Sequence, residues 1–166
     1  MSDLNASLEG LQSAVGSFLA AADGAAGVWT TPRAPGKWSP SQVVEHVARI
    51  MEESANVAAG APSKFPTVPV FLRPFTRLLV FKRILRRKSF LKMKTGEGFD
   101  PPAGAATTAD GRVRVETALK TFDRACRARA DSGQKVASTL FGPVEASDFV
   151  RFQELHVRHH REQLPA

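Results

Sequence analysis

The sequence predicts an all-α protein, a four-helix bundle with a long basic insertion between the second and third main helices. Four segments carry apolar residues at three- and four-residue intervals, which is the spacing of an amphipathic helix. A connection of about 50 residues separates the second of these segments from the third, which is typical of a crossover between bundle helices. No two segments alternate convincingly between apolar and polar residues, so we expect no pair of strands.

The 166 residues are most simply one domain, with enough material for a sizeable core. The hydrophobic fraction of 43% and the charged fraction of 23% are ordinary for a soluble globular protein. Cys126 is the single cysteine, which excludes an intrachain disulfide and Cys₂His₂ zinc fingers. The first residues lack the pattern of a signal peptide and no long apolar run occurs, so we expect a cytoplasmic protein.

The first predicted helix runs from Asp3 to Ala22 and ends at the glycine-rich turn that begins with Asp23. A loop rich in proline and glycine then extends to Lys37. The apolar face of this helix has six members at helical spacing, which are Leu4, Leu8, Leu11, Val15, Phe18 and Leu19.

The second predicted helix has a strong start signal. Ser39 is a good N-cap, Pro40 suits the first helical position, and Gln42 completes a capping box. The helix should end near Ala59, before a Gly-Ala-Pro turn. His46 lies on the flank of the inner stripe, a position from which it can face the core. The stripe itself consists of Val43, Val47, Ile50, Met51 and Ser54.

The insertion covers about residues 62–98 and is the least regular part of the chain. Three prolines keep its first third extended or turning. From Phe75 to Lys88, apolar and basic residues at helical spacing predict a short basic amphipathic helix. Residues 96–111 are rich in glycine, proline and threonine, and we interpret them as a loop.

The third predicted helix runs from Asp110 to about Ala130. A loop with Phe-Gly-Pro at residues 141–143 follows it. We expect Ser147 to cap the fourth helix, with Asp148 favourably placed in the first turn. Helical spacing assigns one face of the third helix to Val113, Leu119, Phe122 and Cys126.

The fourth helix carries three of the four histidines of the chain. His156 and His160 are four residues apart, so they share one helix face, and this spacing lets two imidazoles reach one metal ion. A neutral imidazole on an apolar, inward face needs a partner, and a metal would be one. The same stripe holds Phe149, Phe152 and Gln163, whereas the opposite side holds Arg151, Arg158 and Glu162.

If the second and fourth helices face each other, His46, His156 and His160 form a candidate site for one divalent ion. Three imidazole ligands with an open fourth position are typical of catalytic metal sites, and the open position would hold water or a substrate thiol. Three neighbouring residues are candidates for orienting a ligand or contacting substrate, namely His159, Gln153 and Gln163.

Each of these residues also has an ordinary structural explanation. Histidine pairs at this spacing often occur without a metal, and His46 alone fits a packed or surface position. Phe149 and Phe152 fit a core as well as a substrate pocket. The combined pattern of the two histidine-bearing helices favours the metal site.

Residues 38–46 read Trp-Ser-Pro-x-Gln-x-x-x-His, and residues 156–163 read His-x-x-His-His-x-x-Gln. In order and spacing, this pair of motifs resembles the DinB/YfiT-like superfamily over the whole chain. The resemblance implies a four-helix bundle in which His46, His156 and His160 bind the metal and His159 does not. Phe-Gly-Pro at residues 141–143 is similar to a subgroup of uncharacterised members, whereas the basic insertion departs from the simpler members.

The resemblance also implies a divalent metal, zinc or nickel. Characterised relatives include S-transferases and isomerases that use low-molecular-weight thiols such as bacillithiol or mycothiol. We therefore expect a thiol S-transferase or related isomerase, in which the metal presents a thiolate or water to a small electrophilic substrate. Relatives are often dimers, so the resemblance implies a homodimer as well.

The net charge of +7 is concentrated in the insertion. Ten of the 23 lysines and arginines lie between Ser54 and Gly96, and that stretch has no acidic residue. We expect one positive patch that attracts an anionic thiol or substrate. Its central members are Arg77, Lys82, Arg83, Arg86, Arg87 and Lys88.

The alternative function is a non-catalytic, metal-stabilised bundle whose basic segment binds an anionic partner or a membrane surface. The chain has no recognised nucleic-acid-binding motif and no tyrosine, which disfavours nucleic acid. Membrane contact remains open because aromatic residues interleave with the bases, namely Phe71, Phe75, Phe81 and Phe90.

Overall fold

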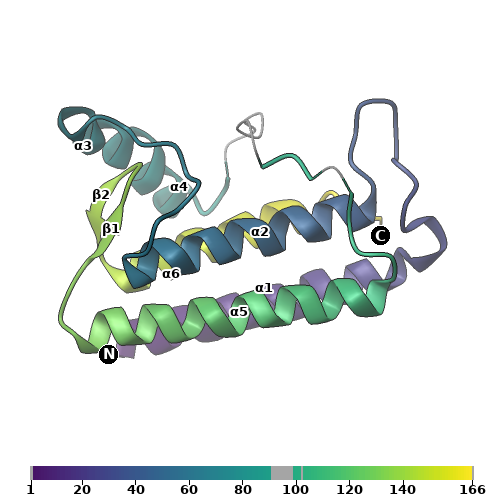
Figure 1. Ribbon diagram of the computed structural model, residues 1–166, viewed down its shortest axis with the longest axis horizontal. Coiled ribbons are helices and arrows are strands. Elements are labelled where there is room, and N and C mark those ends of the chain that lie inside the picture. The colour runs from purple at the N-terminus through teal and green to yellow at the C-terminus, as the bar shows by residue number, and fades with distance from the viewer. Residues whose placement is uncertain (1, 91–98, 102, 166) are drawn as a thin grey trace.

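The computed structural model describes residues 2–90, 99–101 and 103–165. Over these residues the protein is mostly helical, with one small two-stranded sheet (Figure 1), so the predicted all-α class is confirmed. None of the helices in this part of the chain combines the length and the apolar character needed to cross a bilayer. The long helices agree closely with the four predicted segments and are α1 (Ser2–Gly24), α2 (Pro40–Ala59), α5 (Thr108–Asp131) and α6 (Ala146–Arg161).

The long helices pack in two pairs, α2 against α5 and α1 against α6. In Figure 1, α2 and α5 run in one direction along the molecule, and α1 and α6 run in the other. A chain that leaves α2 must therefore return along the whole length of the molecule before it can begin α5. This requirement explains the long connection between residues 61 and 107.

The first part of this connection is helical from Val70 to Arg87. It consists of η2 (Val70–Leu72), α3 (Arg73–Thr76), the π-helical turn η3 (Arg77–Phe81) and α4 (Lys82–Arg87). The predicted basic helix is thus present, and it ends at Lys88, whose φ of 50° is left-handed. Residues 91–98 of the predicted insertion, which include the bases Lys92 and Lys94, lie outside the described residues. A further short 3₁₀ turn, η1 (Ala26–Val28), follows α1.

Local capping explains where α2 begins and ends. The Ser39 side chain accepts from the backbone N–H of Gln42, the Gln42 side chain accepts from the backbone N–H of Ser39, and Pro40 is the first helical residue. Gly60 ends the helix in the left-handed conformation, at a φ of 75°. The predicted capping box and helix end are both confirmed.

The first turns of α5 and α6 begin in different ways, and only the cap of α6 was predicted from the sequence. Thr107 caps α5 by accepting from the backbone N–H of Asp110. The N-cap of α6 is Glu145, without a side-chain hydrogen bond, so the prediction that Ser147 caps this helix is wrong. Ser147 lies inside the first turn because the helix begins at Ala146, whereas Asp148 occupies that turn as predicted.

The prediction of no strand pair is also wrong, because β1 (Val136–Ser138) and β2 (Gly142–Val144) form an antiparallel hairpin. Each strand has only three residues, which is too short for an alternating pattern to stand out in the sequence. The Ser138 hydroxyl accepts from the backbone N–H groups of Leu140 and Phe141 and closes the turn. Gly142, at a φ of 71°, supplies the left-handed residue in it.

The core stripe of α5 is rotated from the predicted face. Phe122 and Cys126 are buried and Leu119 is half-buried, but Val113 is 63% exposed, so the prediction that it shares one face with them is wrong. The first core position of the helix is taken by a glycine, which hydrophobic spacing cannot detect. A Cβ atom there would lie 3.0 Å from the ring of Trp29. The buried stripe consists of Gly111, Val115, Ala118, Phe122 and Cys126.

The returning part of the connection, which we call the return limb (residues 99–101 and 103–107), is fixed to the start of α2. The Gln42 amide donates to the carbonyl of Pro101 at 3.1 Å. The indole N–H of Trp29 donates to the carbonyl of Ala105 at 2.7 Å. Gly104 lies so close to α2 that a Cβ atom would be 2.1 Å from the carbonyl oxygen of Ser41. The limb can follow this path only because residue 104 has no side chain.

Candidate metal centre

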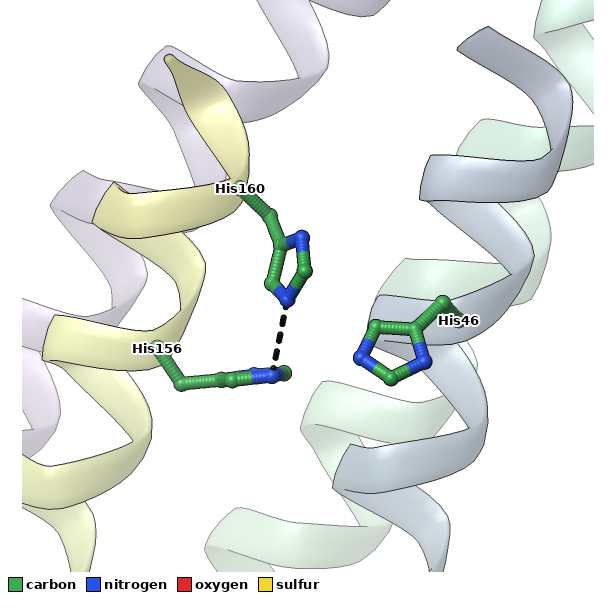
Figure 2. Close-up of side chains that lie close together, drawn as sticks. All are labelled: His46, His156 and His160. Carbon is green, nitrogen blue, oxygen red and sulfur yellow. Dashed lines mark hydrogen bonds between the residues drawn. The ribbon is translucent and has the colours of Figure 1, made fainter. Parts of the chain in front are cut away.

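Three histidines predicted to share a site converge between α2 and α6. His46 comes from α2, and His156 and His160 come from successive turns of α6 (Figure 2). One ring nitrogen from each lies within 4.8 Å of the other two, and the Nε2 atoms of His156 and His160 are 3.0 Å apart. All three side chains are buried. A single point therefore lies within about 3 Å of one nitrogen from each ring.

The return limb orients His46. The Nδ1 atom of His46 is 3.0 Å from the carbonyl oxygen of Phe99. Because a carbonyl oxygen only accepts, Nδ1 carries the proton and donates, and Nε2 keeps its lone pair. The side chain of Trp38 packs against the same ring, with 4.8 Å between ring centroids. The Phe99 carbonyl and the Trp38 ring together orient His46, so its Nε2 atom is available as a ligand on the α2 side of the cluster.

Gln163 orients His160 from just beyond the end of α6. The Nδ1 atom of His160 is 3.1 Å from the amide oxygen of Gln163, so Nδ1–H donates and Nε2 faces His156. The amide nitrogen of Gln163 is 3.4 Å from Nε2 of His159. His159 itself stays outside the cluster of three, half-buried, with its ring 5.9 Å from the ring of Phe90. His159 and Gln163, which were predicted from the sequence as candidates for orienting a ligand or contacting substrate, thus lie beside the candidate metal ligands.

Gln153 lies on α6 one turn before His156 and is 2% exposed. Its amide nitrogen donates to the Ser54 hydroxyl at 2.8 Å. Its amide oxygen is buried and has no hydrogen-bond partner within the described part of the chain. A buried acceptor without a partner is costly, which makes this oxygen a position where a donor group of a ligand would be favoured.

Burial holds the three imidazoles in their neutral form. Desolvation lowers the pKa of His156 well below its ordinary value, and the neighbouring His160 and His46 lower it further. Desolvation, together with His46, lowers the pKa of His160 to about 3, although the hydrogen bond to Gln163 opposes this shift. The pKa of His46 is lowered by desolvation and partly restored by the carbonyl of Phe99. Neutral imidazole is the form that binds a metal.

The donor set fits a divalent metal of the zinc or nickel class. Three neutral imidazole nitrogens suit these ions, and tetrahedral Zn–N bonds of about 2.0–2.1 Å would separate the ligand nitrogens by roughly 3.3–3.4 Å. The separation of 3.0 Å between His156 and His160 is close to that spacing, and His46 lies within 4.8 Å. Hydrogen bonds to a carbonyl and an amide oxygen behind the rings are the usual second layer of such sites.

The three histidines line a cavity of about 680 Å³. Sequence reasoning missed several residues of its wall. Trp38 belongs to the motif at residues 38–46, which was a usable signal. Phe90 lies in the irregular insertion and Phe99 in the loop that follows it, and neither has a local signature. The Phe90 ring meets the edge of His156 at 5.3 Å between centroids. The aromatic lining consists of Trp38, Phe65, Phe90, Phe99, Phe141, Phe149 and Phe152.

The predicted anionic-ligand patch lies apart from this lining, which contains none of its six members. Among the described residues, the base that lines the cavity is Lys37. Lys82 pairs with Asp148 at 2.9 Å, and Arg77 donates to the carbonyl of Pro143 at 3.0 Å. The other four members are the half-buried Arg83 and the exposed Arg86, Arg87 and Lys88.

Comparison with known proteins places the chain in a family. Residues 25–166, which include α2, α5, α6 and all three candidate ligands, match a family model described as protein of unknown function (DUF1569). No curated protein and no solved structure gives a significant match to the chain. Since the matched region covers most of the sequence, the chain belongs to the DUF1569 family.

Proposed function

We propose that this protein is a metal-dependent enzyme of the DinB/YfiT-like type, a four-helix bundle that acts on a small electrophilic substrate with a thiol or water. The most specific candidate is a thiol S-transferase or a related isomerase. The observation that carries the proposal is the convergence of three buried, neutral histidines from α2 and α6, two of them oriented by hydrogen bonds. Their outward nitrogens donate to Phe99 and Gln163, so their inward nitrogens keep lone pairs.

His46, His156 and His160 would hold the metal, and a three-histidine set leaves a coordination position open for the reacting molecule. A divalent metal bound there supplies Lewis acidity, which lowers the pKa of a thiol or water beside it. The chain contributes the rest of the chemistry by keeping the imidazoles neutral and by excluding water with the aromatic wall. An apolar cavity offers little water to stabilise a negative charge, so the polar groups of the site would have to stabilise it.

The reacting thiol must come from outside the chain. Cys126, the single cysteine, is buried in the core and does not line the cavity. Burial raises the pKa of its thiol to about 12, so it stays protonated and unreactive at neutral pH. This excludes a protein-based thiol nucleophile and favours a low-molecular-weight thiol as co-substrate.

Gln153 supplies a criterion for the substrate. Gln153 is a wall residue of the cavity, and its buried amide oxygen has no hydrogen-bond partner among the described residues, so the site would favour a substrate or thiol that carries an N–H or O–H donor beside an apolar body. Low-molecular-weight thiols built from amide and sugar units have such donors. An aliphatic thiol without a donor would leave the oxygen unpaired and should bind less tightly.

Calorimetric titration of the purified, metal-free protein with zinc and with nickel tests the site. We expect one ion per chain for the wild type and at least about a hundredfold weaker binding for His156→Ala, because loss of a ligand exceeds the effect of an outer partner. His159→Ala is the matched control, since it removes a histidine from the same helix without removing a candidate ligand. Equal loss in both variants, or no loss in His156→Ala, would remove the three-histidine site.

Turnover separates an enzyme from a metal-stabilised, non-catalytic bundle. The zinc- or nickel-loaded protein is mixed with a small thiol and a chromogenic electrophile, and the rate is compared with that of buffer containing the same metal. We expect acceleration that disappears in His156→Ala and persists in Arg151→Gln, which alters an exposed residue of the same helix. Tight metal binding without acceleration for any thiol tested would favour the non-catalytic alternative.

A further inference from the structure

The outer side of the helical run from Val70 to Arg87 is unusually apolar. The described part of the chain exposes eight large hydrophobic side chains, and six of them lie within these first ten residues of the run. Figure 1 shows α3 at one end of the molecule, beside the β1–β2 hairpin and away from the middle of the long helices. We call these residues the apolar tip: Val70, Phe71, Leu72, Phe75, Leu78 and Leu79.

The exposure of the apolar tip is large. Phe71 is 73% exposed, Leu78 is 64% exposed and Leu79 is 62% exposed. By contrast, the same run buries Phe81 and Ile84 completely against the protein. The run is therefore a true amphipathic element with a packed inner side, and its outer side has no covering within the described residues. Contiguous exposed apolar surface of this kind marks an interaction site.

Basic residues follow the apolar tip directly. Lys82, Arg86, Arg87 and Lys88 are all exposed, and no acidic residue occurs anywhere from Ser54 to Gly96. Among the ion pairs of the described residues, Lys82 has a partner, Asp148, whereas the other three bases have none. An exposed apolar segment next to unpaired positive charges is complementary to a layered surface that has anionic groups on the outside and apolar groups beneath them.

We propose that residues 70–88 dock this protein on an anionic lipid surface. The apolar tip enters the boundary between headgroups and acyl chains, and the bases from Lys82 to Lys88 contact the anionic headgroups. Both contributions are needed, since a few apolar side chains or a few bases alone give only weak binding to a bilayer. The docking is peripheral and uses a preformed element of the fold.

The combination of charge and apolar side chains argues against two other occupants of this surface, a second copy of the chain and nucleic acid. A second copy of the chain seated tip to tip would bring the same uncompensated bases together, and like charges destabilise such an interface. Nucleic acid would satisfy the bases but would leave the aliphatic side chains of Leu78 and Leu79 in water, because bases stack on aromatic side chains. Anionic lipid satisfies both parts of the surface.

This proposal stands apart from the metal site, because the inner side of the run, not the tip, lines the cavity. Val80 and Ile84 belong to the cavity wall, whereas Leu78 and Leu79 point to solvent. Docking can therefore be measured on metal-free protein, and its failure would not affect the proposed function. Conversely, loss of metal binding in His156→Ala should leave docking unchanged.

The test is sedimentation of the full-length protein with vesicles of pure phosphatidylcholine and with vesicles containing phosphatidylglycerol, at about 0.05 M and about 0.5 M salt. We expect binding to the anionic vesicles at low salt, and weak or no binding to neutral vesicles or at high salt. Absence of binding to anionic vesicles at low salt would overturn the proposal. So would equal binding to both kinds of vesicle.

Matched variants separate the two contributions. Leu78→Ser/Leu79→Ser should weaken vesicle binding at least tenfold, whereas Val113→Ser, which alters an exposed valine on α5, should not. Arg86→Gln/Arg87→Gln should weaken it about 30-fold, at roughly 1 kcal/mol for each base, whereas Lys120→Gln/Arg124→Gln should have little effect. Helix content by circular dichroism confirms that each variant folds.

Two further outcomes would also overturn the proposal. If the tip and control variants bind vesicles equally, the attraction is a property of the whole positive chain and not of this segment. If analytical ultracentrifugation shows a dimer that Leu78→Ser/Leu79→Ser dissociates, and vesicles are not bound, the apolar tip is a self-association surface instead.

Discussion

The histidine site and the basic run of residues 70–88 are the two polar features that stand out in the sequence. The fold buries the first and leaves most of the second exposed. His46, His156 and His160 are buried and pressed together. The bases from Lys82 to Lys88 are mostly exposed. The two regions share one wall, since the inner side of the run lines the cavity that contains the histidines.

The comparison shows how burial decides what a polar side chain can do. A buried histidine loses its charge and keeps a lone pair, which makes it a ligand, and its position is fixed by acceptors such as the Phe99 carbonyl. An exposed arginine keeps its charge and its water, so it acts through long-range attraction. The chemistry is therefore expected at the first region and recognition at the second.

The largest expected effect is on the pH dependence of stability of the metal-free protein. Folding lowers the pKa of His156 and His160, so the unfolded chain takes up protons near pH 6.5 that the folded chain rejects. The contribution of these two histidines to the free energy of unfolding is therefore fully present above that pH, and it is lost as the pH falls toward their folded-state pKa values. Between about pH 7.5 and about pH 5.5, each of these two histidines should cost about 1.4 kcal/mol.

Urea unfolding at the two pH values, with a chelator present, measures this change. The wild type should lose about 3 kcal/mol of unfolding free energy, because two deeply buried histidines contribute. His156→Gln should lose about half as much, since its amide does not titrate. An identical loss in wild type and variant would show that the histidines become protonated without unfolding, and the contrast between the two regions would fail.

The second expected effect, about 2 kcal/mol, comes from Gly104→Ala. The new Cβ would collide with the carbonyl oxygen of Ser41 and push the return limb away from α2. The Phe99 carbonyl would then lose its place behind His46, so zinc affinity should fall along with stability. Gly16→Ala is the control, because nothing lies near that Cβ and alanine favours a helix, so it should stabilise slightly. Urea unfolding and zinc titration together check both variants.

The parts of this site that were predictable from sequence are those with a local cause. The capping box of Ser39 and Gln42 and the four-residue spacing of His156 and His160 each depend on neighbours in the same helix. The orientation of His46 depends on the Phe99 carbonyl, and a backbone carbonyl has no residue signature. The path of the return limb depends on the missing side chain of Gly104, which hydrophobic patterns do not reveal.

The same reasoning explains the errors in the fold. The β1–β2 hairpin is shorter than any window in which alternation can be counted, and its stability comes from packing of Val136 and Val144 into the core. Helical spacing placed Val113 on one face with Phe122 and Cys126, but the buried position at this end of the helix is Gly111, against which Trp29 packs. In both cases a tertiary contact overrides the local pattern.

The third expected effect, about tenfold in zinc affinity, comes from Gln163→Leu. Its amide oxygen holds the proton-bearing Nδ1 of His160, and loss of such a partner typically weakens metal binding by about 10- to 100-fold. The effect should be at the lower end because Gln163 is partly exposed and water can replace it. Gln12→Leu, which alters an exposed glutamine far along α1, is the control. Unchanged affinity in Gln163→Leu would show that the tautomer of His160 is fixed without it.

The smallest expected effect comes from removing charge on the outer side, in Arg86→Gln/Arg87→Gln/Lys88→Gln. These side chains are exposed and have no ion-pair partner among the described residues, so the unfolding free energy should change by less than about 0.5 kcal/mol. The left-handed backbone at Lys88 costs the same with glutamine, which therefore preserves the end of α4. Zinc affinity should also stay within about twofold, because exposed charges are screened over about 10 Å of salt solution. A clear loss of either quantity, by urea unfolding or by titration, would mean that the positive face is part of the site's own stability. Retention of both would leave these bases without a role inside the fold, and interaction with an anionic surface would then account for their presence.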